Sequence, residues 1–157
     1  MRRRDLVLLG VLVGVVGCGG HDFEPPDPEA RIVSAEERLT PLLFDSLSWD
    51  DDDERMFEGN EVYAAKCRRC HGTLGGGGTE YALKRGIEAP SLVEPDWALS
   101  DSFGPLRRLV YTGHLGGMPT WGVAGITPRQ IDASAYYILF GLRPDVLGES
   151  GDTAGGS

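Results

Sequence analysis

Five consecutive residues, Cys67-Arg68-Arg69-Cys70-His71, constrain the fold of this 157-residue chain more than any other feature. They form a C-x-x-C-H motif, in which two thiols at a helix end can each form a thioether to one vinyl group of the same porphyrin. The adjacent histidine then lies under the iron as the proximal ligand. The motif predicts one covalent haem c, attached at Cys67 and Cys70 and ligated by His71.

Two other interpretations of the motif need features that the sequence does not offer. A zinc site would need a second pair of ligands, and a thioredoxin-type dithiol would need a β-α-β context. The chain has only three cysteines. If the third, Cys18, carries a lipid, no cysteine is left for a zinc cluster or a structural disulfide.

The first residues have the composition of a targeting segment. Three arginines at 2–4 precede an apolar stretch at 6–16, which is shorter than the roughly 20 residues of a membrane span. The stretch ends in Val15-Val16-Gly17-Cys18, which resembles a bacterial lipobox. We therefore expect residues 1–17 to be a lipoprotein signal peptide and Cys18 to carry the lipid. The alternative is an uncleaved anchor with a buried cysteine.

Charge is distributed unevenly along the chain. The formal net charge of −9 argues against a nucleic-acid partner, which would require a basic face. Residues 18–53 carry a net charge of −9 and residues 144–157 a net charge of −3, whereas residues 54–143 carry +1. We interpret 18–53 as an acidic, proline-containing tether, in which residues 21–28 have the composition of an extended segment, and 144–157 as a flexible tail rich in glycine and acid. The apolar stretch at 41–47 is suited to lie against the folded domain.

Residues 54–143 have the periodicity of a small all-α domain, without a β pattern. Helices are expected at 54–70 and 106–112, with a helical turn at 81–85. Five glycines between Gly72 and Gly78 predict a loop. A loop-rich domain of this size ordinarily has a core too thin to be stable, so another group must fill its centre.

The last helix has the clearest start signal. Thr127 can cap it, Pro128 occupies its first position and Gln130 completes a capping box. Gly141 and Pro144 are expected to end it. Its apolar residues fall on one stripe: Ile131, Ala135, Ile138, Leu139 and Leu142.

Residues around the motif carry a family resemblance. Gly59 and Tyr63 stand eight and four residues before Cys67, and Tyr136 lies in the last helix. Over roughly residues 54–143 the sequence resembles the class I c-type cytochromes. The resemblance implies three to five helices wrapped around one haem, with the N- and C-terminal helices crossed. It also implies that Gly59 and Tyr63 contact Tyr136 at the crossing.

The sixth iron ligand must come from His114 or Met118. The segment Gly117-Met118-Pro119-Thr120-Trp121 resembles the Met-Pro loop of the family, which implies Met118. Pro90 matches the family's proline whose carbonyl accepts a hydrogen bond from the proximal histidine. Trp121 is expected beside a haem propionate, or else as an ordinary core residue.

Ligation by His71 and Met118 would fill both axial positions of the iron, which suits electron transfer. We therefore expect a membrane-tethered single-electron carrier rather than an enzyme, serving redox partner proteins or a respiratory or photosynthetic complex, possibly as a subunit of one. Its expected location is the bacterial cell envelope, lipid-anchored and facing the periplasm or the exterior. The alternative is a haem enzyme, or a gas or redox sensor, with a labile sixth ligand. The arginines expected to face the partner, or else to neutralise propionates, are Arg68, Arg69, Arg107 and Arg108.

Overall fold

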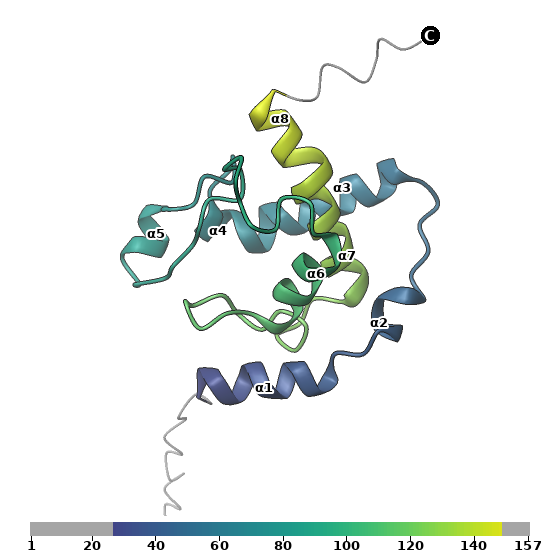
Figure 1. Ribbon diagram of the computed structural model, residues 1–157, viewed down its shortest axis with the longest axis horizontal. Helices are drawn as coiled ribbons and strands as arrows, with labels where there is room; N and C mark the ends of the chain where they lie inside the picture. The colour runs from purple at the N-terminus through teal and green to yellow at the C-terminus, as the bar shows by residue number, and fades with distance from the viewer. Residues whose placement is uncertain (1–26, 149–157) are drawn as a thin grey trace, which may run out of the picture.

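The computed structural model describes residues 27–148, and its regular elements over that range are helices joined by loops, without a β-strand, as expected (Figure 1). No helix among these residues is long and apolar enough to cross a membrane. The expected signal peptide, Cys18 and most of the expected tail lie outside the described residues. The helices are α1 (Pro28–Arg38), α2 (Leu42–Asp45), α3 (Asp52–Val62), α4 (Arg68–His71), α5 (Glu80–Leu83), α6 (Phe103–Thr112), α7 (Pro128–Tyr137) and α8 (Arg143–Leu147).

Helices α3 and α7 form the most extensive helix contact, and they cross near Gly59 (Figure 1). A Cβ on Gly59 would lie 2.2 Å from the carbonyl oxygen of Ala133 and 2.6 Å from Cβ of Tyr137. The rings of Tyr63 and Tyr137 are 5.6 Å apart between centroids. The crossing implied by the resemblance is therefore present, and only glycine permits so close an approach.

The assignment of Tyr136 to this crossing was wrong by one position. Successive residues of an α-helix are rotated by about 100° around its axis, so Tyr136 and Tyr137 face different neighbours. Tyr137 faces α3, whereas Tyr136 packs on Phe103 and Phe140.

Helix α7 begins with the predicted capping box. The Thr127 hydroxyl accepts a hydrogen bond from the Gln130 N–H, and the Gln130 side chain accepts one from the Thr127 N–H. All five residues of the predicted apolar stripe are buried.

The predicted end of this helix was wrong. A π-helical segment, Ile138–Leu142, contains Gly141 and leads directly into α8, which contains Pro144. The helix ends at Gly148, whose φ is 76°. In the π segment the Arg143 N–H bonds to the Ile138 carbonyl, five residues back, a wider turn than the α-helix has. Pro144 follows at the start of the next turn, where its missing N–H is tolerated. A Cβ on Gly141 would lie 2.6 Å from the Met56 sulfur, so this glycine serves helix packing instead.

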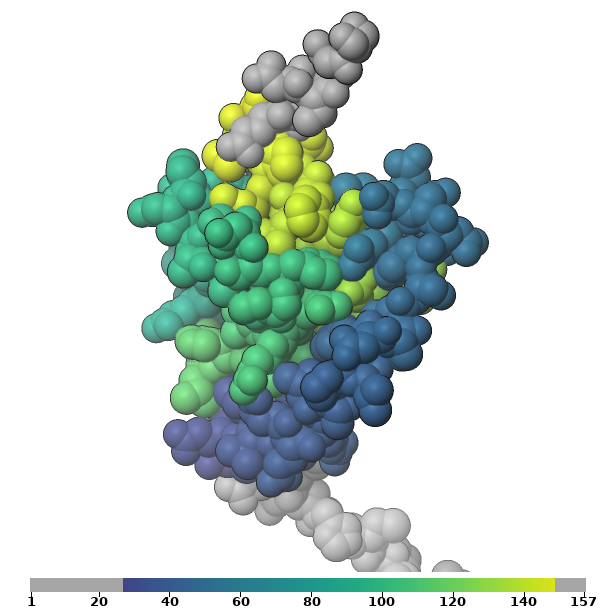
Figure 2. Space-filling model, turned by 45° about the vertical axis from the view of Figure 1, so that its right-hand side comes forward, coloured from purple at the N-terminus to yellow at the C-terminus, as the bar shows by residue number. Residues whose placement is uncertain are grey.

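Within the tether expected at 18–53, the described residues include two helices, α1 and α2, that pack on the domain. The side chain of Asp27 caps α1 by accepting from the Glu29 N–H, and Ala35 is fully buried. Leu43 and Phe44 pack against the core, as expected of the apolar stretch. Figure 2 shows the purple-to-blue segment of α1 and α2 lying directly against the green part of the chain.

A buried carboxylate ties four parts of the fold together. Asp132 in α7 is 1% exposed. It accepts hydrogen bonds from Trp49 Nε1 at 2.9 Å, Arg55 Nε at 2.8 Å and Arg107 Nη1 at 2.9 Å. Arg107 is thus engaged inside the domain, and its neighbour Arg108 pairs with Glu36 of α1. Arg107 is therefore not available in the way expected of a partner-facing residue, whereas Arg108 remains largely exposed.

Replacing Gly59 tests the crossing. Gly59→Ala places a methyl group within 2.2 Å of a backbone oxygen, and we expect the free energy of unfolding to fall by about 3 kcal/mol. The matched control is Gly104→Ala in α6, where an added Cβ meets nothing within 4 Å. Chemical denaturation should show the control unchanged or slightly more stable. Equal stability of the two variants would contradict the close crossing.

Candidate functional site

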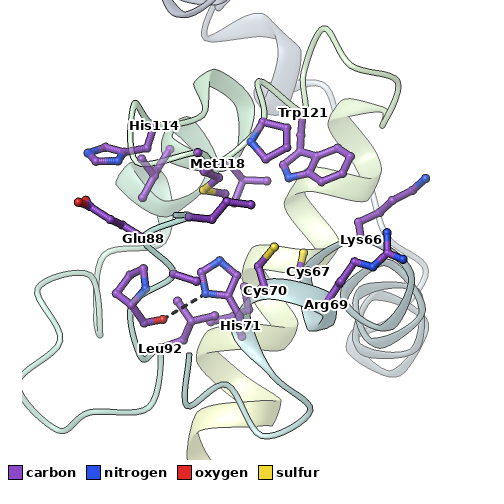
Figure 3. A pocket seen from close by; sticks show the side chains of 18 of the residues that line it. Lys66, Cys67, Arg69, Cys70, His71, Glu88, Leu92, His114, Met118 and Trp121 are labelled. Atoms are coloured by element: carbon purple, nitrogen blue, oxygen red, sulfur yellow. Dashed lines mark hydrogen bonds between the residues drawn. The ribbon is translucent and has the colours of Figure 1, made fainter. Parts of the chain in front are cut away.

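A cavity of about 770 Å³ occupies the centre of the domain. The C-x-x-C-H residues lie on one wall and the loop that carries Met118 lies opposite (Figure 3). Pro90 and Trp121 also line it, so the structure brings together every sequence-predicted site residue within its described range. Apolar side chains complete the walls: Leu92, Leu106, Leu109, Val110 and Ile138.

The two cysteines reach the cavity because helix α3 continues through a π-helical segment, Tyr63–Cys67, into α4. The helix stops at Gly72, whose φ of 81° favours glycine. The Tyr63 hydroxyl donates a hydrogen bond of 2.8 Å to the Gly72 carbonyl and fixes this end. Figure 3 shows both cysteine sulfurs on the side of the cavity next to His71.

His71 is held in one orientation by the predicted backbone contact. Its Nδ1 lies 3.2 Å from the Pro90 carbonyl oxygen. Burial lowers the pKa of His71, against the opposing effect of that hydrogen bond, so the imidazole is neutral at pH 7. A neutral ring that donates from Nδ1 has its lone pair on Nε2, which is the form that ligates metals.

The buried Cys67 thiol does not have the low pKa of a reactive redox thiol. Burial, with a smaller contribution from Cys70, raises the pKa of Cys67 to about 12. Reactive C-x-x-C thiols need a depressed pKa, so Cys67 is unsuited to thiol exchange. Residues 27–148 also hold no group of three or more His, Cys, Asp or Glu arranged to bind a metal.

The glycine-rich loop supports the segment that carries Pro90. The Leu92 N–H donates to the Gly75 carbonyl at 2.7 Å. Gly77 has a φ of 68°, and a Cβ there would lie 2.4 Å from the Ala89 carbonyl oxygen. The two loops therefore fit together only with a glycine at this position. The sequence predicted the glycine-rich loop but not its close packing against the segment that carries Pro90.

Arg143 was missed by sequence reasoning. It is 6% exposed, and its Nη1 donates to the carbonyls of Leu92 and Glu94. Its guanidinium lies 5.4 Å from the ring of Trp97, which lines the cavity. Arginine is usually exposed, and the helix was expected to end earlier. The sequence does contain a signal for the burial of Arg143, because it follows Leu139 by four residues and so continues the apolar stripe of the last helix.

The opposite wall is built by a short turn. The His114 N–H donates to the Met118 carbonyl at 3.1 Å, and the Gly117 N–H donates back to the His114 carbonyl at 3.1 Å. The half-buried Met118 packs against the core. The His114 ring is exposed at the rim, where its Nδ1 accepts from the Gly116 N–H at 2.9 Å. Of the two sixth-ligand candidates, Met118 is the one embedded in the cavity wall.

These features define the class: a small all-α domain with crossed helices, whose cavity presents C-x-x-C-H on one wall and a methionine opposite, is a c-type cytochrome domain. More particularly, residues 54–138 match the model of cytochrome c oxidase, cbb3-type, subunit III, and the chain belongs to that family. The family resemblance found in the sequence is thereby confirmed. Membership implies haem c as cofactor, and the paired thiols, neutral imidazole and apolar walls fit that group.

Several curated proteins are similar to this chain. A cbb3-type cytochrome c oxidase subunit CcoP of Rubrivivax gelatinosus is 26% identical over 121 residues, covering 77% of this chain and 36% of the relative. The CcoP subunit of Rhodobacter capsulatus is 27% identical, with coverages of 73% and 43%. The FixP subunit of Azorhizobium caulinodans is 30% identical, with coverages of 52% and 25%. The chain thus spans less than half the length of each relative. No solved structure gave a significant match.

Removing the Arg143 guanidinium tests its support of the cavity wall. Arg143→Met leaves two backbone carbonyls without their donor, and we expect the free energy of unfolding to fall by about 2 kcal/mol. Arg31→Met, at an exposed position on α1, should change it by less than about 0.5 kcal/mol. Denaturant titration of both variants is the measurement. A loss no larger at Arg143 than at Arg31 would contradict the role.

Proposed function

We propose that this protein is a monohaem c-type cytochrome that carries single electrons for a membrane respiratory complex. The observation that carries the proposal is the opposition of Cys67, Cys70 and His71 on one cavity wall to Met118 on the other (Figure 3). The two cysteines would hold one haem c by thioethers, with His71 and Met118 as its axial ligands. When bound, this group supplies one-electron chemistry.

The protein's own residues favour electron transfer over catalysis. The Pro90 carbonyl orients His71, and burial lowers the pKa of His71, which favours the neutral ring. The apolar walls exclude water from the centre, and Trp121 is expected to close the site beside a propionate. With Met118 as the proposed sixth ligand, both axial positions would be filled, which would leave none for a substrate or a gas. The chain is therefore proposed to be an electron-transfer protein and not itself an enzyme.

The proposed partner class is a membrane respiratory complex. The curated relatives are named as cbb3-type oxidase subunits, which favours a respiratory complex over a photosynthetic one. The lipobox-like ending at Cys18 supports a signal peptide at 1–17 and a lipid anchor. We accordingly place the protein in the bacterial cell envelope, anchored by Cys18 and facing the periplasm or the exterior.

The intact mass of the mature protein tests the cofactor and the anchor together. We expect the mass of a chain that begins at Cys18 and carries diacylglycerol, an acyl group and one haem. The haem should remain attached after acid–acetone extraction. Cys67→Ala with Cys70→Ala should remove the haem mass and leave little folded protein, because the porphyrin fills the cavity. Extractable haem would contradict the covalent site, and an unmodified Cys18 would contradict the anchor alone.

A further inference from the structure

Residues 27–49 pack along α6 and precede residues 54–138, which match the family model. They comprise α1, α2 and most of the link to α3, and we call them the strap. Figure 1 shows α1 next to the light-green loop that follows α6, and Figure 2 shows the same contact from a second direction. The proposed electron-transfer site contains no residue of the strap.

Helix α1 covers one face of α6, and the opposite face of α6 lines the central cavity. Ala35 of α1 is fully buried, and the carboxylate of Glu36 pairs with Arg108 of α6. Glu36 borders a groove that it shares with Leu109, and Leu109 also lines the cavity. A single helix therefore separates α1 from the space proposed for the haem.

The rest of the strap supports the last turn of α6. The ring of Phe44 meets the edge of Tyr111, with centroids 6.4 Å apart, and Trp49 Nε1 donates to Asp132 in α7 at 2.9 Å. The Tyr111 carbonyl accepts from the Gly122 N–H at 3.0 Å, and a Cβ on Gly122 would lie 2.3 Å from the Tyr111 ring. Tyr111 thus lies between the strap and the end of the loop 113–122.

The loop 113–122 carries Met118 and is folded tightly back on α6. At its start, the Gly113 N–H donates to the Leu109 carbonyl at 2.9 Å. A Cβ on Gly113 would lie 2.7 Å from the Met118 carbonyl oxygen, which also accepts from the His114 N–H at 3.1 Å. Because packed interiors transmit displacement, Met118 can leave the cavity wall only if the end of α6 also loosens.

We propose that the strap determines how readily Met118 leaves the iron, because it clamps α6 and with it both ends of the loop 113–122. Ala35, Glu36 and Phe44 are positioning residues in this account, since none of them lines the cavity. The inference rests on the proposed ligation by Met118. Local opening of a segment depends on the packing at its own boundaries and can occur without global unfolding. Undocking the strap should therefore release Met118 more often while the rest of the domain stays folded.

Ligand exchange on the oxidised, haem-loaded protein tests the proposal. Imidazole replaces Met118 only after the sulfur has left the iron, so the limiting rate at saturating imidazole measures that release. Ala35→Asp puts a carboxylate into a fully buried position and should undock α1. We expect the limiting rate in stopped flow to rise about tenfold. Amide hydrogen exchange should also accelerate more in residues 113–118 than in α3.

The ion pair supplies a second variant with a matched control. Glu36→Lys sets two like charges together and should raise the limiting rate about threefold at low ionic strength. Adding Arg108→Glu restores the pair in swapped form and should return most of the wild-type rate. Glu37→Lys changes the net charge equally at an exposed neighbouring position and should leave the rate unchanged. Equal acceleration by Glu36→Lys and Glu37→Lys would overturn the proposal.

A variant that is destabilised elsewhere separates the strap from global stability. Gly59→Ala weakens the helix crossing and should leave the release of Met118 near the wild-type rate. A comparable acceleration in Gly59→Ala, or wild-type rates in both Ala35→Asp and Glu36→Lys, would overturn the proposal. The spectrum of the oxidised wild type is recorded first, because a protein without methionine ligation would refute the proposed axial ligands themselves. Unchanged rates in variants that keep this ligation would refute the role of the strap alone.

Discussion

The close crossing of α3 and α7 is the constraint on which the rest of the structure depends. At Gly59 the two helices approach until there is no room for a Cβ, and the Tyr63–Tyr137 contact extends the same interface. The crossing directs the continuation of α3, with the C-x-x-C-H motif, into the domain centre. It also brings the continuation of α7 to the same cavity, where Ile138 lines the wall and Arg143 bonds to the Leu92 carbonyl behind it. The site is thus assembled where two distant parts of the chain meet.

Much of this small domain consists of loops because these loops form and support the walls of the cavity. The Pro90 carbonyl orients His71. The segment that carries Pro90 is hydrogen-bonded to the glycine-rich loop through the Leu92 N–H and to Arg143 through the Leu92 carbonyl. The walls are apolar and the thiol of Cys67 is protonated, so the space is suited to a large apolar group and not to a metal cluster. Without such a group the core would be hollow, which agrees with the weak hydrophobic support of so small a fold.

Local signals allowed good prediction from the sequence. The capping box at Thr127 and the apolar stripe behind it depend on residues a few positions apart, and both were correct. The family resemblance identified the residues around the cavity, including Pro90 and Met118. Features that depend on packing were missed. The helix continues past Gly141 through a π segment, and Pro144 lies in the first turn of α8, where its missing N–H is tolerated. Helix α1 packs against α6.

The central claim is that His71 and Met118 both ligate the iron. The most direct measurement is the absorption spectrum of the oxidised protein, in which methionine bound to ferric haem c gives a weak band in the far red. We predict this band in the wild type and its loss in Met118→His, which stays low-spin with a potential lower by a few tenths of a volt. Met118→Ala should in addition bind carbon monoxide when reduced. A wild type without the band, or a band that persists in Met118→Ala, would contradict the account.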